Sequence, residues 1–235
     1  MEQQRGNSSL PRFADRSDPE DKRQPLTRAQ VVEAALKVLD EGGLEGLTMR
    51  RLGERLGVKS ASLYWHVRDK DELLNLVADA ICAEIRPPSS TSSWRQRLED
   101  IGREYRRVLL AHRDAAVLMA TTLPVGPHRL RLAESGLATM LEAGFLPEVT
   151  ARASLLFTDY VTNFVVEENR WEAMATAFDP DSDSGDAIRD WFEALPADQY
   201  PSLVALAKHL TDPDSEARFE FGVAILLAGL SQHER

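Results

Sequence analysis

Three ring-bearing residues, Tyr64, Trp65 and His66, are adjacent in the stretch LGVKSASLYWHVRDKDELL. A helix buries one face, so three neighbouring rings cannot all enter one core, and some must meet a partner or solvent. Small residues fill positions 60–62 just before them. A helix that enters a DNA major groove needs such small side chains at its start, because its backbone must come close to the base edges.

The positions around the rings fit the same interpretation. Leu63 and Val67 are four residues apart and can anchor a helix on a core, which leaves the rings to contact sugar, phosphate and thymine methyl groups. Cationic side chains at the edges supply charge for the DNA backbone. The residues expected at the DNA are Arg50, Lys59, Ser60, Ala61, Ser62, Tyr64, Trp65, His66 and Lys70.

Helix signals come in close succession before and after this stretch. Thr27 with Gln30 predicts a capping box, and the pair Gly42-Gly43 is expected to end that first helix. Thr48 predicts the start of a second helix, with Met49, Leu52 and Leu56 facing inward. Gly57 occupies the position favoured for a left-handed residue at its end.

Ser60 is expected to cap a third short helix. Asp69 with Glu72 predicts another capping box, which opens a fourth helix reaching Ile85. Residues 27–68 would then hold three helices, the last two joined by a tight turn at 57–59. This is the arrangement of a helix-turn-helix, although a generic helical hairpin has the same signals. The ring triplet favours the helix-turn-helix.

Charge is distributed unevenly over the 235 residues. The net charge is −10, but residues 25–70 carry +2 and residues 71–235 carry −12. A mildly basic head can approach phosphates that an acidic body would repel. Residues 1–24 are polar and read as a disordered arm. The arm is either a solvated tail or a contact to the DNA backbone or minor groove through Arg5, Arg12, Arg16, Lys22 and Arg23.

Other classes of protein find little support. No apolar run approaches the roughly 18 residues of a membrane span, and the N-terminus lacks the apolar stretch of a signal peptide. Cys82 is the single cysteine, expected to be buried; it allows no internal disulfide and fits the reducing cytoplasm. No G-x-S-x-G, phosphate-binding loop or H-E-x-x-H occurs, and no cofactor or metal cluster is predicted.

One acidic segment, FDPDSDSGDAIRD at 178–190, has alternating carboxylates as in a calcium loop. Its glycine lies at the seventh place instead of the sixth, and no flanking helix pair is evident. We therefore expect a flexible acidic loop.

The rest of the body reads as helices near 94–112, 128–143, 148–171 and 214–232, with a short covering helix within 195–210. The chain is therefore expected to be all-α, with an arm at 1–24, a helix-turn-helix domain at 25–70 and a larger helical domain at 71–235. The run GVAILLAGL is apolar on nearly every side, so one core cannot explain it, and a partner subunit is expected.

The segment LTRAQVVEAALKVLDEGGLEGLTMRRLGERLGVKSASLYWHVRDKDELLNLVADAI resembles the DNA-binding region of the TetR family of bacterial repressors. It is most similar to the tetracycline-responsive members. The resemblance implies a ligand-controlled repressor that binds a palindromic operator as a homodimer through a four-helix bundle. The interface residues expected on the two long apolar helices are Phe157, Val161, Phe164, Val223, Leu226, Leu227 and Leu230.

The resemblance also implies a small-molecule site in the body, whose ligand shifts the fourth helix and pivots the heads. The expected lining is Arg86, Ile101, Tyr105, Met119, Thr122, Ser154 and Thr158. In the tetracycline-responsive members, the places of Arg86, Ile101 and Met119 hold two residues that grip the drug and a histidine that binds its magnesium. A thioether is a poor ligand for magnesium, so a largely apolar or aromatic effector is expected instead.

Operator choice is expected to differ as well, because Met49, Ser60 and Ala61 replace a threonine, a glutamine and a proline of those members. Two other hypotheses remain open at this point. One is a small helical enzyme with a degenerate head. The other is a DNA-binding protein whose body serves only for dimerisation.

Overall fold

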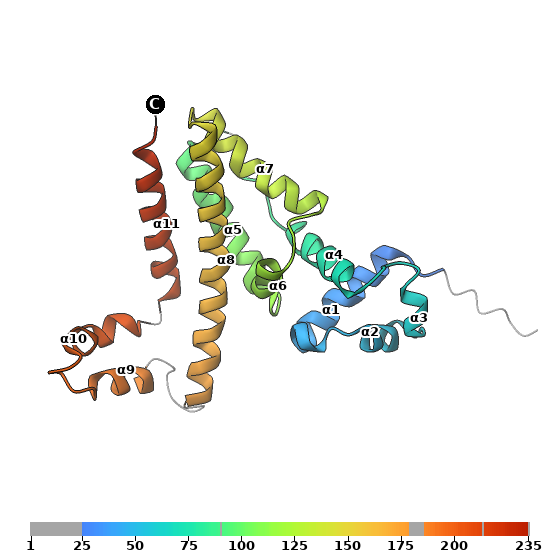
Figure 1. The fold of residues 1–235 in the computed structure, drawn as a ribbon, viewed down its shortest axis with the longest axis horizontal. Helices are drawn as coiled ribbons and strands as arrows, with labels where there is room; N and C mark the ends of the chain where they lie inside the picture. Colours follow the sequence, from blue (N-terminus) through green and yellow to red (C-terminus); the bar gives the residue numbers. More distant parts are fainter. Residues whose placement is uncertain (1–24, 90, 179–185, 213, 235) are drawn as a thin grey trace, which may run out of the picture.

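The computed structural model describes residues 25–89, 91–178, 186–212 and 214–234. Within these ranges the chain forms eleven α-helices and no strands, so the predicted all-α class is confirmed. The head holds α1 (Arg28–Gly46), α2 (Met49–Leu56) and α3 (Ser60–Leu63), and α4 (Lys70–Cys82) joins it to the body (Figure 1). The body holds α5 (Trp94–Ala111), α6 (Ala115–Thr121), α7 (Pro127–Glu142), α8 (Pro147–Phe178), α9 (Asp186–Glu193), α10 (Pro201–Leu210) and α11 (Ser215–Ser231). The N-terminal arm and Asp179, Asp181 and Asp183 of the acidic segment lie outside the described residues.

Local signals set most boundaries of the head. The Thr27 hydroxyl accepts from the Gln30 N–H at 3.2 Å, and Thr27 N–H donates to Gln30 Oε1 at 2.9 Å, which is the predicted capping box. Thr48 caps α2 by accepting from Arg51 N–H. Gly57 ends α2 with φ 67°, a left-handed conformation that suits a residue without a Cβ.

Two details of the head were predicted wrongly. The Gly42-Gly43 pair kinks α1 without ending it: Gly43 has φ 65° and ψ −172°, and the helix continues to Gly46. A carboxylate oxygen of Asp114 accepts from Leu44 N–H at 2.8 Å, so the body holds this kink. Ser60 is the first residue of α3 and not its cap, because Lys59 occupies the cap position without a side-chain hydrogen bond.

The fourth helix also differs from its prediction. Asp69 accepts from Glu72 N–H at 2.7 Å as expected, but the Glu72 carboxylate accepts from Arg68 N–H at 2.7 Å instead of from Asp69. The capping box is therefore only half formed. The helix ends at Cys82, so Ile85 lies beyond it.

Helix α5 is central to the body and packs against α8, α7, α6, α4 and α11. Its inward face is apolar, and Leu98, Ile101, Tyr105, Val108 and Leu109 on it are buried. Helix α8 runs past the predicted end at Trp171 to Phe178, and α10 lies within the segment expected to form a covering helix. Helices α6 and α9 were not predicted.

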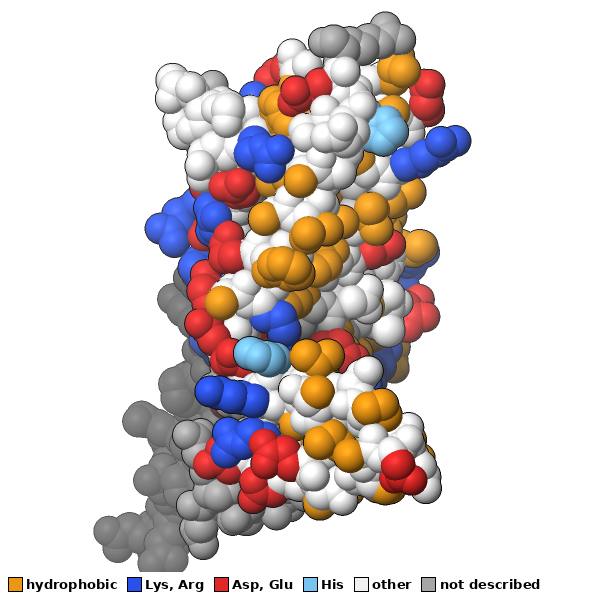
Figure 2. Space-filling model, turned by 90° about the vertical axis from the view of Figure 1, so that its left-hand side faces the viewer, with side chains coloured by type: hydrophobic (Ala, Val, Ile, Leu, Met, Phe, Trp, Pro, Cys, Tyr) orange, Lys and Arg blue, Asp and Glu red, His pale blue; other side chains and the backbone are white. Residues whose placement is uncertain are grey.

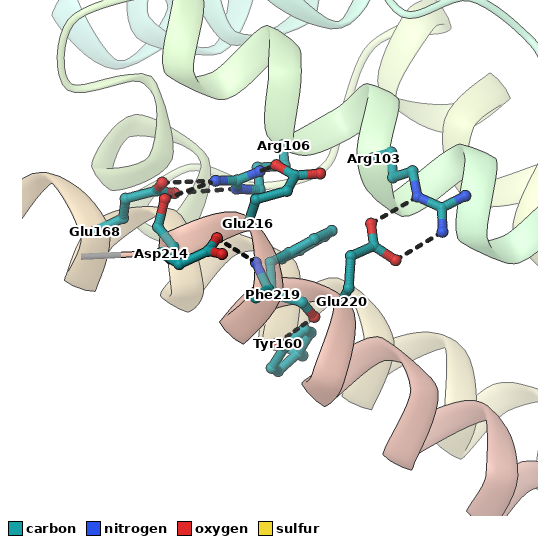
Figure 3. Close-up of polar contacts among 10 residues, drawn as sticks. Arg103, Arg106, Tyr160, Glu168, Asp214, Glu216, Phe219 and Glu220 are labelled. Atoms are coloured by element: carbon teal, nitrogen blue, oxygen red, sulfur yellow. Dashed lines mark hydrogen bonds and ion pairs between the residues drawn. The ribbon is translucent and has the colours of Figure 1, made fainter. Parts of the chain in front are cut away.

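Charged residues connect α5 with α8 and α11 (Figure 3). The buried Arg106 on α5 bonds Glu168 on α8 at 2.6 Å and Glu216 on α11 at 2.5 Å. Arg103 binds both carboxylate oxygens of Glu220 at 2.6 Å, which is the bidentate geometry that arginine favours. Together these pairs fix which face of α11 turns toward the body.

Burial alone would raise the pKa of Glu168. The hydrogen bonds from Arg106 and Ser215, together with the charge of Arg106, outweigh this and lower it. No helix in the described ranges is long and apolar enough to cross a membrane.

Candidate functional site

Two of the three adjacent rings project from the head, and the third, His66, is half-buried. Leu63 and Val67 are fully buried in the head, whereas Trp65 is 89% and Tyr64 54% exposed. The α3 helix is only four residues long, and a turn stabilised by a hydrogen bond from Val67 N–H to the Leu63 carbonyl continues it. An indole this exposed on a small head indicates a surface prepared for a partner.

Small and cationic residues lie beside these rings. Ala61 is exposed, Ser60, Ser62 and His66 are half-buried, and Lys59 and Lys70 are exposed. On α2, the Arg50 side chain is 81% exposed and pairs with Glu54 at 2.7 Å. An exposed pair of this kind contributes little to stability, so Arg50 can leave Glu54 for a stronger partner at small cost.

A cavity of about 520 Å³ lies in the body between α5, α7, α8 and α11. It is lined by Ile101, Tyr105, Ser154 and Thr158 of the predicted set, and further by Cys82, Leu98, Pro124, Arg129, Leu132, Ala133, Gly136, Met140, Val149, Arg152, Ala153, Leu156, Phe157, Ile225, Leu226, Leu227, Gly229, Leu230 and His233. A volume of this size with a mainly apolar wall is typical of small-molecule sites.

The remaining three predicted lining residues do not line this cavity. Arg86 lies past the end of α4 on the outer surface, where its Nε bonds Glu104 at 2.9 Å. Met119 is a core residue of α6, the helix that sequence analysis missed. Thr122 lies behind the wall and accepts from Arg129 Nη1 at 2.9 Å.

Arg129 is a wall residue that the sequence did not reveal. It is 9% exposed and lies on the first turns of α7. Its Nη1 donates to the Leu123 carbonyl at 2.6 Å and to Thr122 Oγ1, and its Nη2 donates to the Met119 carbonyl at 3.3 Å. Arg129 therefore satisfies carbonyls at the C-terminal end of α6.

Asp79, on the helix α4 that joins the head to the body, contacts the N-terminus of α7 next to Arg129. Its Oδ1 accepts from the backbone N–H groups of His128 and Arg129, each at 2.9 Å, at the N-terminus of α7. Gly126 allows this approach: its φ is 138°, and a Cβ there would lie 2.5 Å from Asp79 Oδ1. A carboxylate at a helix N-terminus is stabilised by the free N–H groups and the helix dipole. The one sign of this contact in the sequence was an acidic residue, Asp79, within the apolar face of α4.

The expected interface residues lie mostly inside the protomer. Val161, Val223, Leu227 and Leu230 are buried inside the protomer. Phe157, Phe164 and Leu226 are half-buried, so none of the seven is fully exposed. The stripe of rings on α8 packs inward, and α11 is apolar on so many sides that its pattern could not select the outward face.

A different apolar set is exposed on the two helices. It consists of Leu155 and Leu156 on α8 and Phe221 and Ile225 on α11, which are 57–69% exposed. Figure 2 views the molecule from the side of α11 and shows hydrophobic side chains gathered in the middle of this face. We call these four residues the outer apolar face.

Comparison with known sequences identifies both parts of the chain. A family model described as "Bacterial regulatory proteins, tetR family" matches residues 31–77, and one described as "Tetracyclin repressor-like, C-terminal domain" matches residues 86–233. The chain belongs to the TetR family. Its relatives include the class A tetracycline repressor from transposon 1721 of Escherichia coli, which is 35% identical over 214 residues covering 90% of this chain and 92% of that protein. An HTH-type transcriptional regulator of Saccharopolyspora erythraea is 35% identical over 207 residues, covering 88% and 85%.

Solved structures agree with the fold. The TetR family protein ActR of Streptomyces coelicolor in complex with actinorhodin superposes with a TM-score of 0.80, at 34% identity, over 90% of this chain and 98% of ActR. ActR in complex with (S)-DNPA gives 0.77 at 35% identity, over 88% and 98%. The predicted family is confirmed, and the chain is a ligand-responsive transcriptional repressor of that family.

Proposed function

We propose that this TetR-family regulator acts in the cytoplasm as a homodimer on a near-palindromic operator and is released by a small, largely apolar effector. The observation that carries the proposal is the 520 Å³ cavity, whose wall includes the first turns of α7. ActR, a protein with this fold, is solved in complex with actinorhodin.

The contacts of Asp79 give this repressor a route from the cavity to the head. Asp79 is on α4, the helix that packs against α1 of the head, and it holds the N-terminus of α7 beside the cavity. A ligand that moves this end of α7 moves α4 and pivots the heads, so that their spacing no longer matches successive major grooves. The ligand needs only to prefer the state that cannot bind DNA.

The outer apolar face supports the dimer. Four exposed large side chains on two neighbouring helices are what a four-helix bundle between subunits would bury. A single head with a four-residue recognition helix covers few base pairs, so two copies on a symmetric site are needed for specificity.

Magnesium–tetracycline is not the effector in this proposal. The cavity wall contains no carboxylate and one histidine, His233, and the described residues hold no group of three or more His, Cys, Asp or Glu arranged for a metal. A hard cation such as magnesium needs oxygen or nitrogen ligands. Calorimetric titration with tetracycline and magnesium should show no binding, and the operator complex should not be released. Micromolar binding that frees the operator and disappears in chelator would contradict this.

Selecting bound fragments from the source genome tests the proposal. We expect near-palindromic sites with half-site centres about one helical turn apart, roughly 34 Å. An organic extract of the source organism, made at acidic pH, should release them in a gel shift. Fragments without symmetry, or complexes that no extract releases, would contradict the proposal.

A further inference from the structure

The charge of the cavity wall differs from that of the chain. The whole chain carries a net charge of −10, yet the wall contains Arg129 and Arg152 and no Asp or Glu. His233 is the one other titratable nitrogen there. A mainly apolar wall with cations and no acids favours a ligand that has an apolar frame and a negative charge.

The two arginines are not equivalent. Arg152 is exposed, so water and salt screen its charge. Arg129 is buried, and its guanidinium donates to neutral oxygens of Met119, Thr122 and Leu123. None of these partners of the guanidinium is a carboxylate. A buried cation that forms no ion pair attracts an anion that enters the same cavity.

The neighbouring thiol and phenol groups carry no negative charge that could pair with Arg129 at neutral pH. Burial raises the pKa of Cys82 to about 12, and burial likewise raises the pKa of Tyr105 to about 12, so both stay protonated. The nearby Asp79 carboxylate makes its hydrogen bonds to two backbone N–H groups at the start of α7 and none to the Arg129 guanidinium. The guanidinium therefore has no direct carboxylate partner, and an acidic group on a ligand can take that place.

We infer that the effector carries an acidic group on its apolar frame, such as a carboxylate, sulfonate or ionised phenol, and that Arg129 is its counter-ion. This inference rests on the proposed function of the cavity as the effector site. It adds that the ligand is negatively charged and that Arg129 binds this charge. An acidic group that binds Arg129 also competes for the guanidinium N–H donors that bind the carbonyls at the end of α6. These donors lie beside the α7 backbone N–H groups that Asp79 binds.

Two dyes of nearly the same frame test the inference. 1-Anilinonaphthalene-8-sulfonate is an anion, and N-phenyl-1-naphthylamine is the same frame without the sulfonate. Fluorescence titration of the full chain should give a Kd at least about tenfold lower for the sulfonate. In Arg129→Gln this preference should disappear. In Arg131→Gln, which removes an exposed arginine from the same helix, it should remain.

Two further variants keep the result interpretable. Arg129→Lys retains the charge and should retain most of the preference, even if Arg129→Gln does not fold. Gly136 lines the cavity, and a Cβ there would meet nothing within 4 Å, so Gly136→Trp should fill the space and abolish binding of both dyes. Sulfonate binding that survives Gly136→Trp would lie outside the cavity and would contradict the inference.

Failure of this inference can be distinguished from failure of the proposed effector site. Equal binding of the two dyes in the wild-type protein, or an unchanged preference in Arg129→Gln, overturns the inference and leaves the proposed cavity in place. Binding of neither dye overturns the inference and the proposed effector site together.

Discussion

Arg50 and Lys70 are both exposed cations of the DNA-binding region, but they differ in expected role. Arg50 projects from α2 beside the recognition residues, where a bidentate contact to a base edge would specify sequence. Arg50→Ala should cost about 1–3 kcal/mol of operator binding and relax choice at one base pair. Lys70→Ala should weaken all sequences alike and flatten the salt dependence by about one unit.

Gel-shift titrations at several salt concentrations, on the operator and its single-base variants, measure both effects. Lys208→Ala on α10 is the matched control and should change neither. Unchanged affinity and specificity in Arg50→Ala would show that this residue does not read bases.

At the scale of elements, Asp79 connects α4 with α7. Asp79→Ala removes the acceptor of two α7 N–H groups and should cost about 1–3 kcal/mol of stability. Operator affinity without effector and dye binding in the cavity should stay close to wild type. The ratio of operator Kd values with and without the releasing extract should fall several-fold. Asp71→Ala, an exposed acid on the same helix, is the control. A full release ratio in Asp79→Ala would exclude this route.

The Arg103–Glu220 pair fixes α11 on α5 and gives stability a pH dependence. The hydrogen bond from Arg103 lowers the pKa of Glu220 below its ordinary value of 4.5. A lowered folded pKa contributes stability that is complete above the unfolded pKa and is lost as pH falls through the folded one. The melting temperature should therefore drop as the pH falls below the ordinary pKa of 4.5. Glu220→Gln should lower it at pH 7 and flatten this drop, whereas the exposed control Glu193→Gln should not. Parallel profiles for wild type and Glu220→Gln would refute the assignment.

The head could be predicted from sequence because its signals are local. Thr27, Thr48 and Gly57 act within a few residues of their own position, and Leu63 and Val67 show the buried side of α3. Ile101 and Tyr105 were expected at the cavity through the family resemblance, and both line it from α5.

The misses depend on contacts between distant segments. From the sequence alone, Arg129 would be expected at the surface. It is buried because carbonyl oxygens at the end of α6 accept from its guanidinium. The rotation of α11 is set by Arg103 and Arg106, over a hundred residues away, because its own sequence is apolar on nearly every side. The kink at Gly43 likewise needs Asp114.

For the whole molecule, the outer apolar face should make the dimer. Phe221→Asp or Ile225→Asp places a charge in that interface and should give monomers by light scattering at micromolar concentration, with operator affinity reduced at least about a hundredfold. Leu130→Asp changes a similarly exposed leucine on α7 and should leave the dimer intact. A dimer unaffected by both changes on α11 would place the interface elsewhere.

In the proposed mechanism, occupancy of the body cavity controls operator binding by the head. Gly136→Trp tests it most directly, because the indole would occupy the space that the effector needs while every DNA-contacting residue stays unchanged. Operator affinity, measured by fluorescence anisotropy with increasing amounts of the releasing extract, is the readout. We expect operator binding within about threefold of wild type and a rise of at least about tenfold in the extract concentration needed for release. Release at the wild-type concentration would contradict it.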